Sequence, residues 1–208
     1  AIALVALVGL PGLVSPMRLQ VDALDYVDPD LPAARDTRAF TDQVVGLTSV
    51  ALLVTTPAGA VLEPRTLAAL AVLSDELAAE PAVGSVVGLP AVLRLRRYAA
   101  GLGEALPRDE SGLAAVAADL EQLLLVEPTL RQWVDTTNLQ ATYLTVTARA
   151  GDPGGLGALR AGVEAAWRRA SSSSPALQDF SYRLVGSGVL QATIAAQLVP
   201  TLVHSFTI

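Results

Sequence analysis

The sequence predicts an α+β protein in which two strand–helix–strand units surround a pair of helices, with a stub of a transmembrane helix at each end. Three observations support this prediction. Short apolar or alternating segments are followed by segments of helical periodicity, once in each half of the chain. Glycine and proline separate these segments. The 14 basic and 20 acidic residues all lie between Arg18 and Arg183, so both ends are apolar and carry no formal charge apart from what His204 might carry.

The first half supplies one strand–helix–strand unit. Residues 18–22 alternate and predict a short strand, and an acidic, proline-containing loop then leads to a helix over 33–45. Residues 49–55 are continuously apolar, which is typical of a strand covered on both faces. A helix over 64–79 and a strand over 83–87 follow. The helix carries an apolar stripe that we expect to pack against strands: Leu67, Leu70, Leu73 and Leu77.

Two helices are predicted next, over 90–102 and 111–126, with Ser111 as the N-cap of the second. The second helix has an apolar stripe formed by Leu113, Val116, Ala117, Leu120 and Leu124. These helices form an insert between the two units.

The second unit begins with an alternating strand over 141–148. A helix over 156–170 and a last strand over 180–185 complete it. One face of the strand over 141–148 consists of Thr142, Leu144, Val146 and Ala148. The apolar stripe of the helix consists of Leu156, Leu159, Val163 and Trp167.

These elements predict five parts: 1–17, the end of a membrane helix; 18–88, a first βαβ-type subdomain; 89–130, the helical insert; 131–187, a second βαβ-type subdomain; and 188–208, the start of a membrane helix. We expect each subdomain to be a ferredoxin-like sandwich with a mixed sheet. The two ends should leave the folded middle near each other, since they belong to spans that pack side by side.

The composition excludes several classes of protein. The net charge is −6 and every cation is arginine, which argues against a nucleic-acid partner. The single basic cluster, at Arg94, Arg96 and Arg97, is either a solvated helix face or a contact for anionic lipid. The absence of cysteine excludes disulfides and thiolate chemistry.

No catalytic or cofactor motif is complete, so we expect no enzyme activity, no metal and no cofactor. Gly186-Ser187-Gly188 resembles the start of a dinucleotide fingerprint, but Gln191 stands where the third glycine belongs. His204 is the only histidine and lies in an uncharged segment. An acidic loop lacks the glycine and terminal glutamate of a calcium loop: Asp22, Asp25, Asp28 and Asp30.

The aromatic residues are few. Trp167 lies on a helix stripe and is expected in the core. Tyr98 and Trp133 lie at the edges of the insert and are the candidates for lining a hydrophobic substrate path, with plain packing as the alternative.

Several segments carry a resemblance to one family through their order and spacing, and together they cover nearly the whole chain. They are VDALDYVDPDLPAARD, the stretch from VVGLTSVALLVTTP to EPAVGSVVG, the pair Leu106-Pro107, WVDTTNLQATYLTVTARAG and RLVGSGVLQATIAAQLVPTLVHS. The chain resembles the extracytoplasmic porter loop of resistance-nodulation-division (RND) superfamily exporters, in the branch of the mycobacterial large membrane proteins (MMPL). The YVDPD and EP-x-x-L segments resemble the loop of the second half.

This resemblance implies a porter domain of a proton-driven exporter of lipids or other hydrophobic molecules. It places the domain on the periplasmic or extracellular side of the bacterial cytoplasmic membrane. The implied partners are the other half of the same transporter, a hydrophobic small molecule or lipid, and the membrane at both termini. The alternative is a membrane-tethered extracytoplasmic ligand-binding or sensory module. A soluble hydrolase is a third, weaker hypothesis.

Overall fold

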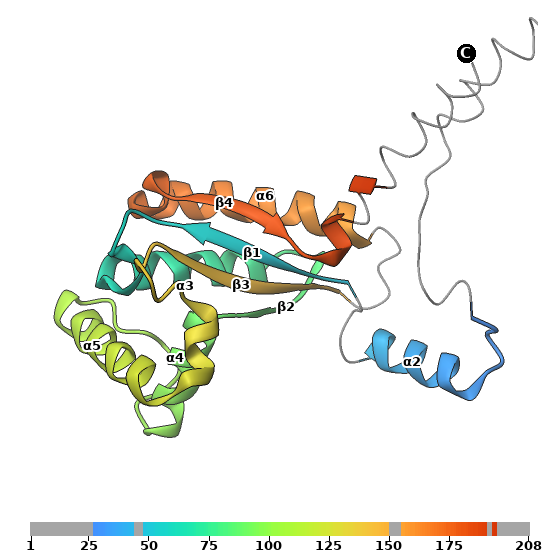
Figure 1. The fold of residues 1–208 in the computed structure, drawn as a ribbon, viewed down its shortest axis with the longest axis horizontal. Helices are drawn as coiled ribbons and strands as arrows, with labels where there is room; N and C mark the ends of the chain where they lie inside the picture. The colour runs from blue at the N-terminus through green and yellow to red at the C-terminus, as the bar shows by residue number, and fades with distance from the viewer. Residues whose placement is uncertain (1–26, 44–47, 150–154, 191–192, 195–208) are drawn as a thin grey trace, which may run out of the picture. The chain divides into compact units, whose positions relative to one another are not determined.

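A computed structural model describes residues 27–43, 48–149, 155–190 and 193–194 (Figure 1). The chain divides into two units, one of residues 39–191 and one of residues 1–38 with 192–208. The fold and the candidate site below belong to residues 39–191. Helix α2, Pro32–Gln43, crosses the boundary between the units.

The elements of residues 39–191 follow one another closely along the chain. In order they are β1 (Ser49–Thr55), η2 (Ala60–Leu62), α3 (Pro64–Ala78), β2 (Val83–Val87), α4 (Leu89–Ala99), α5 (Glu110–Val126), η3 (Pro128–Trp133), β3 (Ala141–Ala148), α6 (Gly155–Ser173), η4 (Pro175–Asp179) and β4 (Ser181–Val185). The α+β class is therefore confirmed, and β1, β2 and β3 have the bounds that the sequence predicts.

All of the described strands form one four-stranded sheet in the order β2-β3-β1-β4, with every neighbouring pair antiparallel. The expectation of two sandwiches with mixed sheets was wrong for this part of the chain. The two strands of each strand–helix–strand unit run parallel but leave the width of one strand between them. The other unit fills that gap: β3 lies between β2 and β1, and β1 lies between β3 and β4.

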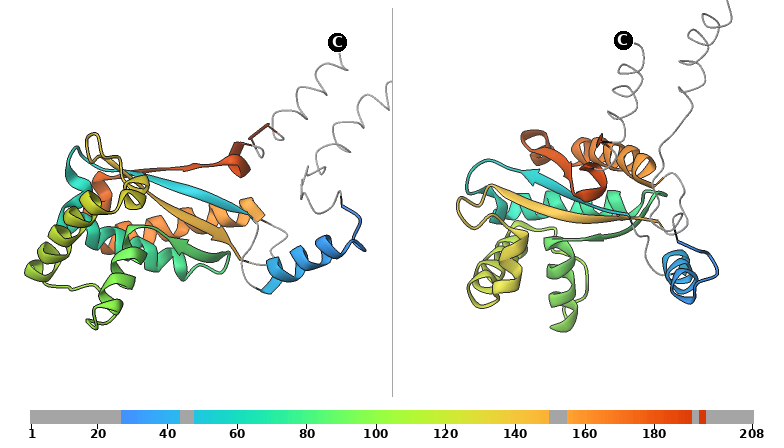
Figure 2. Two further views of the ribbon diagram at one scale, coloured as in Figure 1. Left: turned by 60° about the horizontal axis from the view of Figure 1, so that its bottom comes forward. Right: turned by 45° about the vertical axis from the view of Figure 1, so that its right-hand side comes forward.

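The core lies on one face of this sheet, beneath α3 and α6 (Figure 2). Leu52 of β1 and Leu144 of β3 are register partners, and both are fully buried there. The stripes of the two helices face them, with Leu70 and Leu159 fully buried. Trp167 was expected in the core, but it is only partly buried and packs against the edge of this core.

The opposite face of the sheet is only partly covered. Along β1 the buried residues alternate with half-buried ones, so the strand is not enclosed on both faces as its apolar run predicts. Ala51, Leu53 and Thr55 lie on this second face, which we call the open face. It is the front of the sheet in Figure 1.

A second core holds the helical insert. Leu67 of α3 is buried there among Val61, Leu89, Leu93 and four residues of the predicted stripe of α5: Val116, Ala117, Leu120 and Leu124. Leu67 was expected to pack against strands, but it lies three residues closer to the start of α3 than Leu70 and packs against α4 and α5 instead. Helix α3 therefore contributes to both cores.

The cap of α5 also differs from the prediction. Asp109 is the N-cap, and its Oδ2 accepts a hydrogen bond from the Gly112 backbone N–H at 2.9 Å. Ser111 lies within the first turn and donates from its hydroxyl to the same carboxylate at 2.7 Å. At the other end of α5, the Arg131 guanidinium donates to the carbonyl oxygens of Leu124 and Leu125.

Three of the predicted elements lie outside the described residues. They are the strand over 18–22, the membrane stub over 1–17 and, apart from residues 188–190 and 193–194, the stub over 188–208. Among the helices that the structure describes, none has the length and apolar character needed to cross a membrane.

Candidate functional site

Trp133 lies at the end of η3 and stacks on Tyr143 of β3, with ring centroids 4.9 Å apart and planes inclined by 22°. Two contacts place it there. Val134 forms a β-bridge with Thr142, and the Thr142 hydroxyl donates to the Trp133 carbonyl oxygen at 2.8 Å. Tyr143 is half-buried and belongs to the open face, because Thr142 and Leu144 on either side of it face the core.

The second aromatic candidate lies elsewhere. Tyr98 is on α4 with 62% of its surface exposed, and it belongs to neither core cluster and not to the Trp133–Tyr143 stack. Leu95 and Leu102, three and four residues away, are similarly exposed. The structure therefore does not join the two candidates in one path, and their contact with a substrate stays a prediction.

The arginines of α4 make contacts within the chain. Arg94 forms an ion pair with Asp75 at 2.7 Å, and Arg96 binds Asp119 through two hydrogen bonds of 2.6 and 2.9 Å. The Arg97 side chain donates to the carbonyl oxygens of Ala105 and Leu102. These contacts favour a solvated helix face over a contact with anionic lipid. The three guanidinium groups already have partners within the chain and therefore attract a lipid phosphate less strongly.

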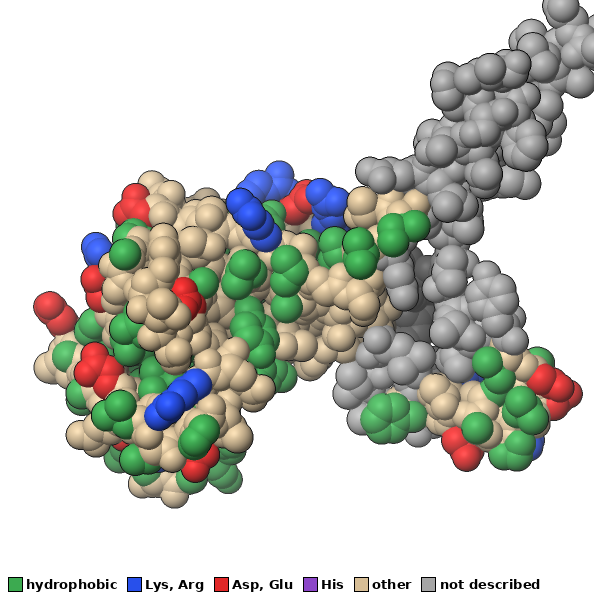
Figure 3. All heavy atoms as spheres, in the orientation of Figure 1, with side chains coloured by type: hydrophobic (Ala, Val, Ile, Leu, Met, Phe, Trp, Pro, Cys, Tyr) green, Lys and Arg blue, Asp and Glu red, His purple; other side chains and the backbone are tan. Residues whose placement is uncertain are grey.

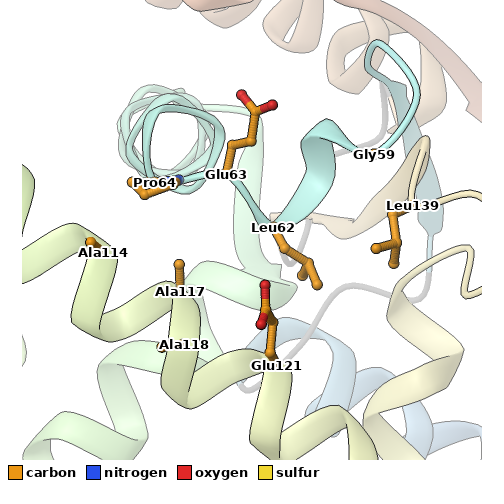
Figure 4. Close-up of a pocket in the computed structure, with 9 residues that line it drawn as sticks. All are labelled: Gly59, Leu62, Glu63, Pro64, Ala114, Ala117, Ala118, Glu121 and Leu139. Atoms are coloured by element: carbon orange, nitrogen blue, oxygen red, sulfur yellow. The ribbon is translucent and has the colours of Figure 1, made fainter.

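A hollow of about 330 Å³ lies between the start of α3 and α5 (Figure 4). Its lining residues come from η2, α3, α5 and the loop before β3: Gly59, Leu62, Glu63, Pro64, Ala114, Ala117, Ala118, Glu121 and Leu139. Backbone hydrogen bonds join the two segments that form one wall, η2 and the loop before β3: the Gly59 N–H donates to Asn138 O and the Val61 N–H to Leu139 O. The hollow has no signature in the sequence, because the residues of its walls are distant from one another in the chain.

The chemistry of the hollow is limited by its lining. Carboxylates are the only side-chain polar groups there. Glu121 points from α5 toward Leu62, whereas Glu63 points away from α5 and forms an ion pair with Arg65 at 2.6 Å (Figure 4). Such a site suits an apolar group that carries a positive charge. It offers no hydroxyl, thiol or imidazole to act as a nucleophile.

The perturbed pKa values lie at structural contacts. Hydrogen bonds to Glu76 and then Glu80 raise the pKa of Arg169, which joins α6 to α3. Burial raises the pKa of Tyr182, and the Glu164 carboxylate adds to this effect. Because both groups lie on the helical side of the sheet, away from the hollow, they do not mark a catalytic site.

The other sequence motifs are only partly described. Gly186 has a φ of 135° and ends β4, and its carbonyl oxygen accepts from the Leu190 N–H in the following turn. Asp28 accepts a hydrogen bond from the Asp30 backbone N–H in the loop before α2. Asp22, Asp25 and His204 lie outside the described residues. Within the described part of the chain, no three metal-ligating side chains lie together.

Comparison with protein-family models, with curated proteins and with solved structures finds no match for this chain.

Proposed function

We propose that this chain is the extracytoplasmic porter domain of a proton-driven, RND-type exporter of lipids or other hydrophobic molecules at the bacterial cytoplasmic membrane. Its fold would be a single ferredoxin-like βαββαβ arrangement with the helical insert between β2 and β3. Its work would be conformational, the opening and closing of a path shared with the other half of the transporter, and not the making or breaking of bonds.

One observation carries this proposal. Of the strands that the structure describes, β1 is the first in the chain and β4 the last, and they are antiparallel neighbours with Ala51 opposite Val185. Entry and exit therefore lie at the same end of adjacent strands. A domain inserted between two neighbouring membrane spans must return to the place where it began. The uncharged segments before Arg18 and after Arg183 agree with such an insertion.

The membrane side of the domain can be tested in cells that contain the full-length protein. The turn at Gly101–Gly103 is exposed, and both glycines have positive φ, so it is a suitable insertion point for a reporter. We expect alkaline phosphatase inserted there to be active, and a fluorescent reporter that folds only in the cytoplasm to stay dark. The opposite result would contradict the proposal. The flanking gene sequence should also encode further membrane spans.

Substrate contact can be tested by an export assay on the same protein. Trp133→Ala should lower export if the Trp133–Tyr143 stack touches a hydrophobic substrate, and Tyr98→Ala should do so if the insert lines the path. Trp167→Phe is the control, because Trp167 packs beside Tyr182 on the helical side of the sheet. Export unchanged in both test variants would remove these residues from the path.

The alternative is a membrane-tethered ligand-binding or sensory module, and the hollow beside α5 is the observation that favours it. Titration with a long-chain alkylammonium probe distinguishes the two functions. Saturable binding at micromolar concentration that Glu121→Gln weakens would support the binding module. A porter domain that presents only part of a path should bind the probe weakly.

A further inference from the structure

The open face of the sheet has a regular chemical pattern. Its residues occupy rows that cross the strands, because antiparallel register partners point to the same side. The first row is Val87, Thr145, Ala51 and Val185, from β2 to β4. The two valines at its ends are 42% and 41% exposed.

The second row lies two residues further along the strands. On β3, β1 and β4 it consists of Tyr143, Leu53 and Arg183. Strand β2 has ended at this level, and the bridge between Val134 and Thr142 puts the end of η3 in its place. Trp133, stacked on Tyr143, therefore completes the row. Arg183 is the only charged residue among the strand residues that point to the open face.

Both rows are complementary to themselves when reversed. In the first row, reversal places valine on valine and alanine on threonine. In the second, it places Arg183 on Trp133 and Leu53 on Tyr143. A twofold axis parallel to the strands, between β1 and β3, performs this reversal for both rows at once. The next row, formed by Thr55, Ala141 and Ser181, is small and leaves room for a close approach.

We propose that a second copy of this chain docks face to face on the open face, with Arg183 of each copy over Trp133 of the other. Sheets that pack this way lie about 10 Å apart with strands inclined by about 30°. An arginine and an indole on opposite sheets fill that gap and form a cation–π contact.

The pattern favours a second copy over a small ligand. Interface cores are enriched in aromatic residues and arginine and depleted in carboxylates, as this face is. Small ligands favour concave sites, whereas the rows cross the surface of a sheet. Figure 3 shows hydrophobic side chains distributed over the front of this part of the molecule, with basic side chains near its upper edge. The area is modest: four strands at about 4.8 Å spacing and five residues at about 3.4 Å give roughly 300 Å² in projection. The contact is therefore weak and reversible.

This inference goes beyond the proposed function, and either can fail without the other. If both hold, the second copy shields the Trp133–Tyr143 stack, and a hydrophobic substrate reaches it only after the copies separate.

Cross-linking of the full chain tests the geometry. The chain has no cysteine, so each introduced thiol is unique. Val87→Cys and Val185→Cys are prepared separately, mixed, and treated with a bifunctional thiol reagent of about 10 Å reach. The mixed sample should give several-fold more covalent dimer than either variant alone, because like positions are displaced sideways by about 14 Å. Equal yields, or a Val185→Cys product alone from edge-to-edge pairing of β4, would overturn the proposal.

Sedimentation of the full chain in mild detergent tests the chemistry. Arg183→Glu should weaken self-association about tenfold or more, because two symmetry-related contacts are lost together. Arg183→Lys should retain much of it. The matched control is Arg160→Glu on α6, whose side chain pairs with Glu164 on the helical side. A monomer at all concentrations up to about 1 mM, or equal weakening in the control, would overturn the proposal.

Discussion

Gly88 shows how closely the start of the insert packs on the sheet. A Cβ atom at this position would overlap Cδ2 of Leu144 and lie 3.2 Å from the Tyr143 carbonyl oxygen. Its backbone is extended, with a φ of 178°, so the glycine is needed for space and not for an unusual conformation. The absence of a side chain allows the chain to pass from β2 into α4 directly against β3.

Gly88→Ala should therefore lower the free energy of unfolding by about 1–3 kcal/mol, the usual range for overpacking. Gly157→Ala is the matched control, since Gly157 lies in α6 with nothing within 4 Å of a new Cβ. That control should raise stability by up to about 1 kcal/mol through helix propensity. Urea unfolding measures both. Equal effects of the two substitutions would contradict the packing at Gly88.

Some residue-level features could not be predicted from the sequence. Tyr143 was not recognised as the partner of Trp133, although its position between Thr142 and Leu144 indicates the open face. The alternation of β3 predicts which side a residue points to, but not which distant aromatic residue lies there. Pairing with η3 depends on the Val134–Thr142 bridge, which has no local signal.

Among the elements, α5 depends on the cap at its first turn. Hydrogen bonds from the Ser111 hydroxyl and then the Gly112 N–H lower the pKa of Asp109. Since the folded pKa lies below the ordinary value, the cap contributes fully above pH about 4. Its contribution is lost as the pH falls through the lowered pKa.

Asp109→Ala should thus speed hydrogen exchange in the first turn of α5 at pH 7, while Asp109→Asn should preserve protection, because an amide oxygen also accepts from Gly112 N–H. Below the lowered pKa of Asp109, the exchange rate of this turn in the wild type should approach that of the alanine variant. The asparagine variant has no carboxyl at this position, so its exchange should not depend on this titration. Unchanged exchange in Asp109→Ala at pH 7 would show that another group caps the helix.

The elements themselves could be predicted well, but not their assembly. Alternation and apolar runs are local, and they predict β1 and β3 with the observed bounds. Sheet order is not local: nothing in residues 49–55 indicates that 141–148 and 181–185 lie on either side. The cap of α5 illustrates the same limit on a small scale, since Asp109 and Ser111 are both capping residue types and only the backbone geometry selects one.

At the scale of the whole molecule, α3 contributes to two cores. Leu70 is buried against the sheet and α6, and Leu67, three residues earlier, is buried against α4 and α5. A single helical stripe predicts burial for both leucines but cannot say that two different partners bury them. The insert therefore packs on the sheet domain mainly through α3, with smaller contacts to β2 and β3, and is the part most able to open alone.

Leu67→Ala and Leu70→Ala test this attachment as a matched pair, since the side chains are identical, both almost completely buried, and less than one turn apart. Each should create a cavity that costs about 2–5 kcal/mol. Leu70→Ala should raise hydrogen exchange throughout the sheet, α3 and α6, because it weakens the core on which everything else depends. Leu67→Ala should raise exchange mainly in α4 and α5, with β1 and β3 less affected. Equal exchange profiles in the two variants would mean that the cores unfold as one cooperative unit, and the insert would then have no independent motion to contribute to an opening path.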